Sequence, residues 1–239
     1  MQHDFILLDR SGSMGGTMWT EALGAINGYV KKLADDNIDT GVTLAVFDSN
    51  EPFKIIRDRI TPKTWRPVTN DDAMPRGGTP LNDATNELIA LAERGPPWGG
   101  QYEKVAIVIM TDGNENASQE YSARFGGTEK IKSRLDQCRA RGWVVQMLGA
   151  GFDNQAQATA YGATRGATIQ TSAVNLGATM GTLASKRGIY STTTAAGAAA
   201  AATMDWMELE QDALKSDKAV KPEDLQNKTY ERNVLKSDI

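Results

Sequence analysis

The sequence predicts a doubly wound α/β fold, in which a mostly parallel central sheet carries helices on both faces and has one antiparallel edge strand. Two observations predict it. Short apolar runs alternate with amphipathic stretches of helical periodicity over residues 1–190, which is the pattern of βαβ units. The first run, residues 4–9, is almost continuously apolar, as expected of a central strand buried on both faces.

The first half of the chain supplies a strand, a helix and a hairpin. After the strand at 4–9, residues 17–36 repeat apolar side chains at helical spacing, among them Ala22, Ile26 and Leu33. Residues 41–47 and 52–59 are two strands joined by a polar turn at 48–50, which predicts an antiparallel hairpin at the sheet edge. Three prolines keep 60–78 out of regular helix.

The second half continues the alternation. Thr79 is expected to be an N-cap, with Pro80 at the first position of a helix that runs to about Glu93. Strands are expected over 103–110, 143–148 and 167–170, and helices over 128–141, 154–161 and 174–186. Residues 191–239 then form a separate region: an Ala/Thr-rich linker, a short helix at 203–214 and a charged tail.

Hydroxyl and carboxylate side chains follow three of these elements. Asp9, Ser11 and Ser13 come directly after the first strand, Asp112 follows the strand at 103–110, and Thr79 stands before a helix. Because ligands of an open α/β sheet bind beyond the carboxyl ends of its strands, we expect these side chains to meet at one rim. Hard oxygen ligands of this kind suit a small divalent cation.

These three segments resemble the metal-ion-dependent adhesion site of the von Willebrand factor A family, whose pattern is D-x-S-x-S, then a Thr in a Gly-rich loop, then an Asp in a T-D-G-like turn. Each position is matched in this order, by Asp9, Ser11, Ser13, Thr79 and Asp112. The resemblance implies that the two serines bind Mg2+ (or Mn2+) directly, and that the other three bind it directly or through water. It also implies that a partner's Asp or Glu completes the coordination. Small stand-alone members of bacterial or phage type are the nearest likeness.

Composition narrows the class of function. The formal net charge is −4 and no basic block stands out, so a nucleic-acid partner is not expected. No apolar run approaches the roughly 20 residues of a membrane helix, and no export signal opens the sequence. The single cysteine, Cys138, excludes an internal disulfide. We therefore expect a cytoplasmic protein without a membrane partner.

A protein-interaction module is favoured over an enzyme, because the expected rim carries no His or Cys and Asp9 is not part of a D-x-D pair. Asn114, Glu115, Asn116 and Trp19 are candidate contacts for the partner, which relatives suggest is an AAA+ ATPase or a phage or stress-system component. Two alternatives remain: a structural or assembly protein that acts mainly through its C-terminal tail, and a metal-dependent hydrolase.

Overall fold

A computed structural model of the chain describes residues 1–150, 159–162, 168–171 and 176–192. Its centre is a six-stranded sheet with the order β3-β2-β1-β4-β5-β6. The strands are β1 (Gln2–Asp9), β2 (Gly41–Asp48), β3 (Glu51–Ile60), β4 (Lys104–Thr111), β5 (Val144–Ala150) and β6 (Thr168–Thr171). All neighbouring pairs are parallel except β2 and β3. The predicted fold class is confirmed, including the antiparallel strand at the edge.

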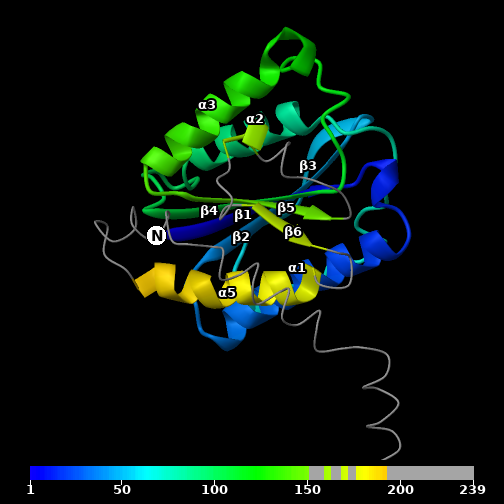
Figure 1. The fold of residues 1–239 in the computed structure, drawn as a ribbon. Helices are drawn as coiled ribbons and strands as arrows, with labels where there is room; N and C mark the ends of the chain where they lie inside the picture. The colour runs from blue at the N-terminus through cyan, green and yellow to red at the C-terminus, as the bar shows by residue number, and fades with distance from the viewer. Residues whose placement is uncertain (151–158, 163–167, 172–175, 193–239) are drawn as a thin grey trace, which may run out of the picture.

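Among the described residues, α1, α2, α3 and α5 cover the two faces of this sheet (Figure 1). On one face lie α2 (Leu81–Glu93) and α3 (Gly127–Ala140); on the other lie α1 (Thr17–Asp35) and α5 (Leu176–Thr192). Three short 3-10 turns lie in the loops: η1 (Gly12–Met14), η2 (Pro62–Thr64) and η3 (Ala123–Phe125). The layers are those of a doubly wound α/β domain.

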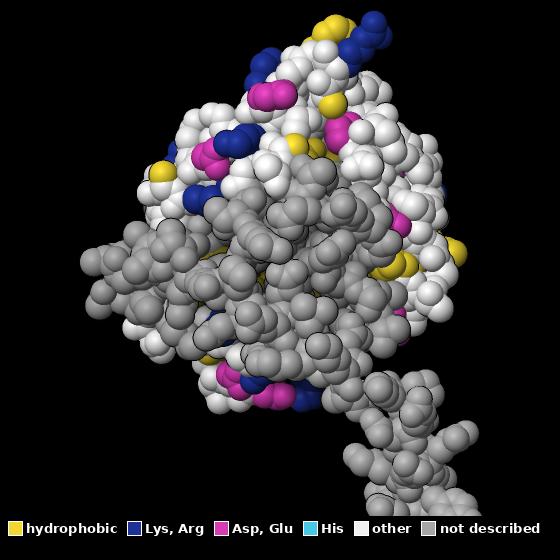
Figure 2. Space-filling view, in the orientation of Figure 1, with side chains coloured by type: hydrophobic (Ala, Val, Ile, Leu, Met, Phe, Trp, Pro, Cys, Tyr) yellow, Lys and Arg dark blue, Asp and Glu magenta, His cyan; other side chains and the backbone are white. Residues whose placement is uncertain are grey.

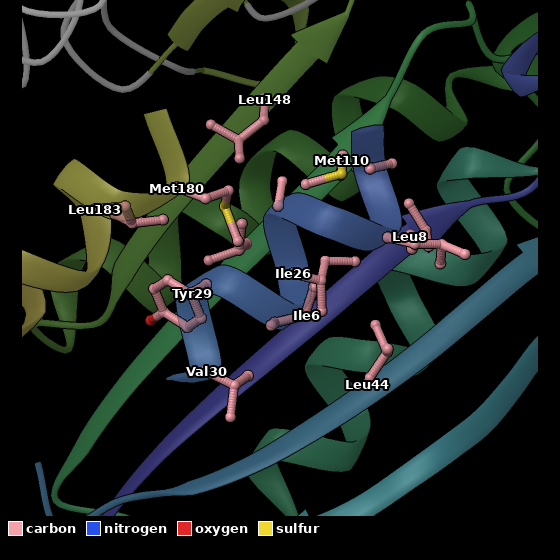
Figure 3. Packing of buried hydrophobic residues seen from close by; sticks show 14 of the residues in the cluster. Ile6, Leu8, Ile26, Tyr29, Val30, Leu44, Met110, Leu148, Met180 and Leu183 are labelled. Carbon is pink, nitrogen blue, oxygen red and sulfur yellow. The ribbon is translucent and has the colours of Figure 1, made fainter. Parts of the chain in front are cut away.

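Alternate residues of each central strand pack into two separate hydrophobic cores, one on each face of the sheet. Ile6 and Leu8 of β1 pack with Ile26 of α1 and Met180 of α5, as Figure 3 shows. Phe5 and Leu7 point to the opposite face and pack under α2 and α3. Both faces of β1 are buried, which is why its central residues, 5–8, are continuously apolar.

The order of the strands places the topological switch between β1 and β4. The chain proceeds outward from β1 through β2 to β3 in one direction, and from β4 through β5 to β6 in the other. At such a point the loops leaving the two central strands diverge and leave a crevice, which is where open α/β sheets bind ligands. Asp9 ends β1 and Asp112 follows directly after β4, so both lie at this crevice.

One predicted feature of α2 is corrected. Thr79 is not the N-cap: the helix begins at Leu81, and Pro80 occupies the N-cap position without a capping side chain of its own. The first-turn N–H groups of Asn82 and Asp83 instead donate to the side chains of Glu115 and Ser118. Proline has no backbone N–H, so it is tolerated at the start of a helix, where that group would have no partner within the helix. The hydroxyl of Thr79 is consequently not used to cap α2. The predicted helix at 154–161 lies mostly outside the described residues, as do the tail beyond 192 and its expected helix at 203–214.

The described surface in the view of Figure 2 carries acidic and basic side chains interspersed around α3, without one large patch of either sign. Within the part of the chain that the structure describes, no helix is both long enough and apolar enough to cross a membrane.

Candidate metal centre

Asp9 is the most buried member of the candidate site. Its side chain is inaccessible to solvent, although it stands at the very end of β1. The backbone N–H of Ser11 donates a hydrogen bond to Oδ1 over 2.7 Å, and the Thr111 hydroxyl donates to Oδ2 over 2.6 Å. One contact comes from the loop after β1 and the other from β4, so the carboxylate is oriented by both central strands.

Ser11, Ser13 and Asp112 form a short chain of oxygens beside it. The hydroxyls of the two serines lie 3.1 Å apart. The Ser13 hydroxyl donates a hydrogen bond to Oδ1 of Asp112 over 2.8 Å, across 99 residues of sequence. Ser11 is buried, Asp112 is half-buried and Ser13 is exposed, so the oxygens lead from the sheet outward to solvent. The η1 turn directs these hydroxyls back toward the strand ends.

Thr79 reaches the same place from the loop before α2. A methyl group placed on Gly113 would lie 3.0 Å from the Thr79 hydroxyl oxygen and 3.7 Å from that of Ser13. The backbone of Gly113 therefore lies beside both hydroxyls. Asn116 fastens Thr79 by two hydrogen bonds: the Thr79 N–H donates to Oδ1 of Asn116 over 2.8 Å, and the Asn116 N–H donates to the Thr79 carbonyl over 3.1 Å. All five predicted side chains thus come to one rim.

The electrostatics of this rim suit a cation. Burial raises the pKa of Asp9 to about 6, and hydrogen bonds from Thr111 and Ser11 offset it only in part. Burial likewise raises the pKa of Asp112. Among the described residues neither carboxylate forms an ion pair with Lys, Arg or His. Arg10, which directly follows Asp9 in the sequence, pairs with Asp48 and Glu51 instead. The burial of two carboxylates without a compensating charge is costly, and either protonation or a bound cation relieves that cost.

The donor chemistry also limits which cation fits. Within the described residues no three His, Cys, Asp or Glu side chains cluster in a way that could hold a metal. A cation here would therefore depend on serine and threonine hydroxyls besides the two aspartates. Such an all-oxygen set fits Mg2+ or Mn2+ and not a metal that prefers sulfur or nitrogen ligands.

Sequence reasoning missed three residues of this rim. Thr111 orients Asp9, and Arg10 and Asp48 pair behind the loop that carries the serines. A signal for Asp48 was available, because it ends a strand parallel and adjacent to β1 and so reaches the same edge of the sheet. The sequence pattern assigns Asp48 to the polar turn at 48–50, whereas the structure makes it the last residue of β2.

The four candidate contacts for a partner lie in different environments. Asn114 and Asn116 are exposed, although Asn116 holds Thr79. The Glu115 carboxylate is taken up by four hydrogen bonds, from the N–H groups of Asn82, Ala117 and Ser118 and from the Ser118 hydroxyl. Trp19 is 4% exposed and its indole N–H donates to Asn70. Our expectation of a surface contact at Trp19 is therefore wrong, because its helical position faces the core.

These observations define a class first: a Rossmann-like α/β domain with an oxygen-rich site at its topological switch point. The sequence profile of the von Willebrand factor type A domain matches residues 5–175, and the chain belongs to this family. Among curated proteins, none matches this sequence.

Solved structures share the fold at low sequence identity. The vWF domain of the type V pili tip protein Mfa5 from Porphyromonas gingivalis has a TM-score of 0.60 at 11% identity; the match covers 81% of this chain and 97% of that domain. The minor pilin PilB from Streptococcus sanguinis has a TM-score of 0.57 at 14% identity over 78% of this chain and 61% of its own. The SpRpn10 VWA domain has a TM-score of 0.50 at 13% identity over 73% and 94%.

Proposed function

We propose that this chain is a metal-dependent protein-interaction module, in which Mg2+ (or Mn2+) at the rim binds a carboxylate of a protein partner. The residues that would hold the cation are Asp9, Ser11, Ser13, Thr79 and Asp112. The observation that carries the proposal is that these five side chains converge on one rim, where the two aspartates form no ion pair with any residue that the structure describes. When bound, the cation would supply a positive charge with a position open to an Asp or Glu carboxylate.

The chain's own residues prepare this position. Thr111 and the Ser11 N–H hold the Asp9 carboxylate in one orientation, and Asn116 holds the Thr79 backbone. The exposed Ser13 and half-buried Asp112 lie on the solvent side, where a partner would approach. Since the ligand atoms are already ordered, little conformational entropy would be lost when the cation binds.

Binding is favoured over catalysis for a chemical reason. The chain has one histidine and one cysteine. His3 stands at the opposite end of β1 from Asp9, and Cys138 is buried in α3. No general base or thiol nucleophile from these residue types therefore reaches the rim. Mfa5 and PilB, two of the similar folds, are pilus proteins, which supports a role in contacts between proteins.

The finer parts of the proposal are the cytoplasmic setting, a stand-alone bacterial or phage type, and a partner such as an AAA+ ATPase or a stress-system component. They rest on the likeness of the sequence motifs. The alternative of an assembly protein acting through residues 191–239 concerns a segment that lies outside the described residues beyond 192.

The test uses Mn2+ as a probe in two stages. Isothermal titration would first measure Mn2+ binding to the wild-type chain, Asp9→Asn and Asp112→Asn, with Asp35→Asn on the exposed end of α1 as the control. Water proton relaxation of the bound Mn2+ would then be followed while N-acetyl-aspartate amide is added. We expect saturable binding that both site variants lose, and displacement of Mn2+-bound water by the carboxylate.

Two results would contradict the proposal. Equal Mn2+ binding by all four proteins would place the cation elsewhere. Mn2+-dependent hydrolysis of a phosphate ester, abolished in Asp112→Asn, would favour the metal-dependent hydrolase instead.

A further inference from the structure

Asp48, at the end of β2, is a fully buried carboxylate that contacts three separate segments. Its Oδ2 lies 2.5 Å from Nε of Arg10. Arg10 stands between Asp9 and Ser11 in the D-x-S-x-S motif. The same Asp48 oxygen accepts a hydrogen bond from Nε of Arg76 over 3.1 Å. Its Oδ1 accepts the N–H groups of Asn50 and Glu51, over 2.6 and 3.0 Å, and so closes the β2–β3 turn.

Glu51 completes this group. Its Oε2 accepts a hydrogen bond from Nη2 of Arg10 over 2.6 Å and lies 3.3 Å from Nη2 of Arg76. We call this group of four side chains the Asp48 cluster: Arg10, Asp48, Glu51 and Arg76. Their formal charges sum to zero, with the exposed Lys54 3.5 Å from Glu51 at the solvent edge. The two arginines of the cluster are therefore paired with Asp48 and Glu51, and neither forms an ion pair with Asp9 or Asp112.

The backbone around the cluster links the loops that carry the metal-site residues. The Arg76 N–H donates to the Arg10 carbonyl over 2.7 Å, and the Gly12 N–H donates to the Gly77 carbonyl over 3.0 Å. The loop that carries Ser11 and Ser13 is in this way joined to the loop that carries Thr79. Ser49, in the β2–β3 turn, holds Gly78 of the same loop. The Ser49 N–H donates to the Gly78 carbonyl over 3.0 Å, and the Gly78 N–H donates to the Ser49 hydroxyl over 2.8 Å.

We propose that the Asp48 cluster positions the two loops that bring Ser11, Ser13 and Thr79 to the cation, and that it thereby sets the affinity of the site for divalent metal. Arg10 is a positioning residue: its guanidinium holds two carboxylates behind the loop and contacts none of the predicted ligands. This inference rests on the proposed metal site.

The proposal and simple electrostatics predict opposite changes in Mn2+ affinity when the charge of Arg10 is removed. Removing a positive charge near a cation site would by itself tighten the binding of Mn2+. If Arg10 acts by holding the loop, its removal instead weakens binding, because the serine hydroxyls lose their fixed placement. The direction of the change in affinity therefore distinguishes the two effects.

The experiment measures Mn2+ affinity of the full chain by titration, together with the electron paramagnetic resonance spectrum of the bound Mn2+. The variants are Arg10→Met, Arg10→Lys and the half-exposed Arg76→Met. Arg187→Met is the matched control, since Arg187 forms the other fully buried Arg–Asp pair of the described residues, with Asp4 at the far end of β1. Should Arg10→Met fail to fold, Arg76→Met tests the same prediction, because 49% of its side chain is exposed.

We expect Arg10→Met to weaken Mn2+ binding by about 10-fold or more, within the range seen when groups that orient metal ligands are removed. The Mn2+ affinity of Arg10→Lys is expected to lie between those of wild type and Arg10→Met, since an ammonium cannot hold two carboxylates in the fixed geometry of a guanidinium. Arg76→Met should weaken binding several-fold. The spectrum of bound Mn2+ should change in these variants and remain as in wild type in Arg187→Met, whose affinity stays within about twofold.

Unchanged or tighter Mn2+ binding in folded Arg10→Met and Arg76→Met, with wild type binding normally, would overturn the positioning role alone. Equal weakening in Arg187→Met would do the same, because it would assign the effect to general loss of stability. Failure of the wild-type chain to bind Mn2+ would overturn both this inference and the proposed function.

Discussion

Gly113 shows how closely the residues of the rim are packed. A methyl group at this position would approach the Thr79 hydroxyl to 3.0 Å, which is tighter than ordinary van der Waals contact. No other atom lies closer to that methyl position. The glycine of the T-D-G turn is therefore explained by the limited space beside the Thr79 hydroxyl, a proposed metal ligand, and by no unusual backbone angle.

We accordingly expect Gly113→Ala to displace the Thr79 hydroxyl and to weaken Mn2+ binding by roughly tenfold, while stability changes by about 1 kcal/mol or less. Titration with Mn2+ and urea unfolding would measure the two effects. Gly24→Ala, on α1 with open space around it, is the control. Unaltered Mn2+ affinity in Gly113→Ala would show that Thr79 does not bind the cation closely.

The environment of His3 determines the protonation state of its imidazole. It is fully buried and contacts the rings of both Phe5 and Tyr102, at centroid distances of 4.4 and 4.7 Å. Its Nε2 lies 2.9 Å from the Thr43 hydroxyl. Burial, assisted by the charges of Arg59 and Arg187, lowers the pKa of His3 to about 3 from its usual 6.5. The folded chain therefore keeps this imidazole neutral.

This pKa shift predicts a loss of stability in acid. Below pH 6.5 the unfolded chain takes up a proton at His3, whereas the folded chain does not until about pH 3. The free energy of unfolding therefore decreases progressively as the pH falls through this window, and the decrease due to His3 is about 2 kcal/mol by pH 5. Urea unfolding of wild type and His3→Gln from pH 7 to pH 5 would measure it as a difference in slope. Parallel slopes would contradict it.

At the scale of elements, the loop between β4 and α3 is bound to the first turn of α2. The Asp83 carboxylate accepts the N–H groups of Gln119, Glu120 and Tyr121, over 2.7, 3.3 and 2.8 Å. Asp83 lies where a negative charge also favours the start of a helix. The same loop carries Asn116, which holds Thr79. Order in this loop and order at the metal-site hydroxyl are therefore linked.

Asp83→Ala should release the loop without unfolding α2. Hydrogen bonds to a charged acceptor contribute roughly 1.5–3 kcal/mol, so exchange of the amides at 119–121 should accelerate by at least about tenfold. Hydrogen exchange followed by mass spectrometry would detect this. Glu87→Ala, exposed on the same helix, serves as the control. Unchanged protection of 119–121 would mean that other contacts hold the loop.

At the scale of the whole molecule, a buried ion pair joins the two ends of the described chain. Nε of Arg187 on α5 lies 2.6 Å from Oδ1 of Asp4 on β1, and both side chains are almost inaccessible to solvent. The Tyr29 hydroxyl of α1 donates to the other Asp4 oxygen over 2.9 Å. The pair thus secures α5 beside α1, at the end of the sheet opposite to the metal site.

Arg187→Met should lower the free energy of unfolding by about 3 kcal/mol, because it leaves the Asp4 carboxylate buried without its cation. Arg141→Met removes a half-exposed ion pair with Glu93 and should cost about 1 kcal/mol or less. Chemical denaturation of both variants would measure the difference. Similar losses in the two would show that burial adds nothing to the Arg187 pair.

Much of this molecule was predictable because local patterns report burial and chain direction. The apolar run of β1 indicated a central strand, and parallel strands bring their carboxyl ends to one edge. Asp9 and Asp112 could therefore be assigned to a common rim before their distances were known. The start of α2 lies one residue later than the sequence predicts, since Thr79 and Pro80 are both acceptable at a helix N-terminus.

The sequence by itself determined the fold class and the chemical nature of the rim, because side-chain periodicity and the residues after each strand are local properties. Only the tertiary structure decided which distant residues meet. Asp48 and Arg76 join Arg10 across three loops, Trp19 turns into the core, and Arg187 pairs with Asp4 across 183 positions. Contacts of this kind depend on how whole elements pack, and no local pattern encodes the partner of a buried charge.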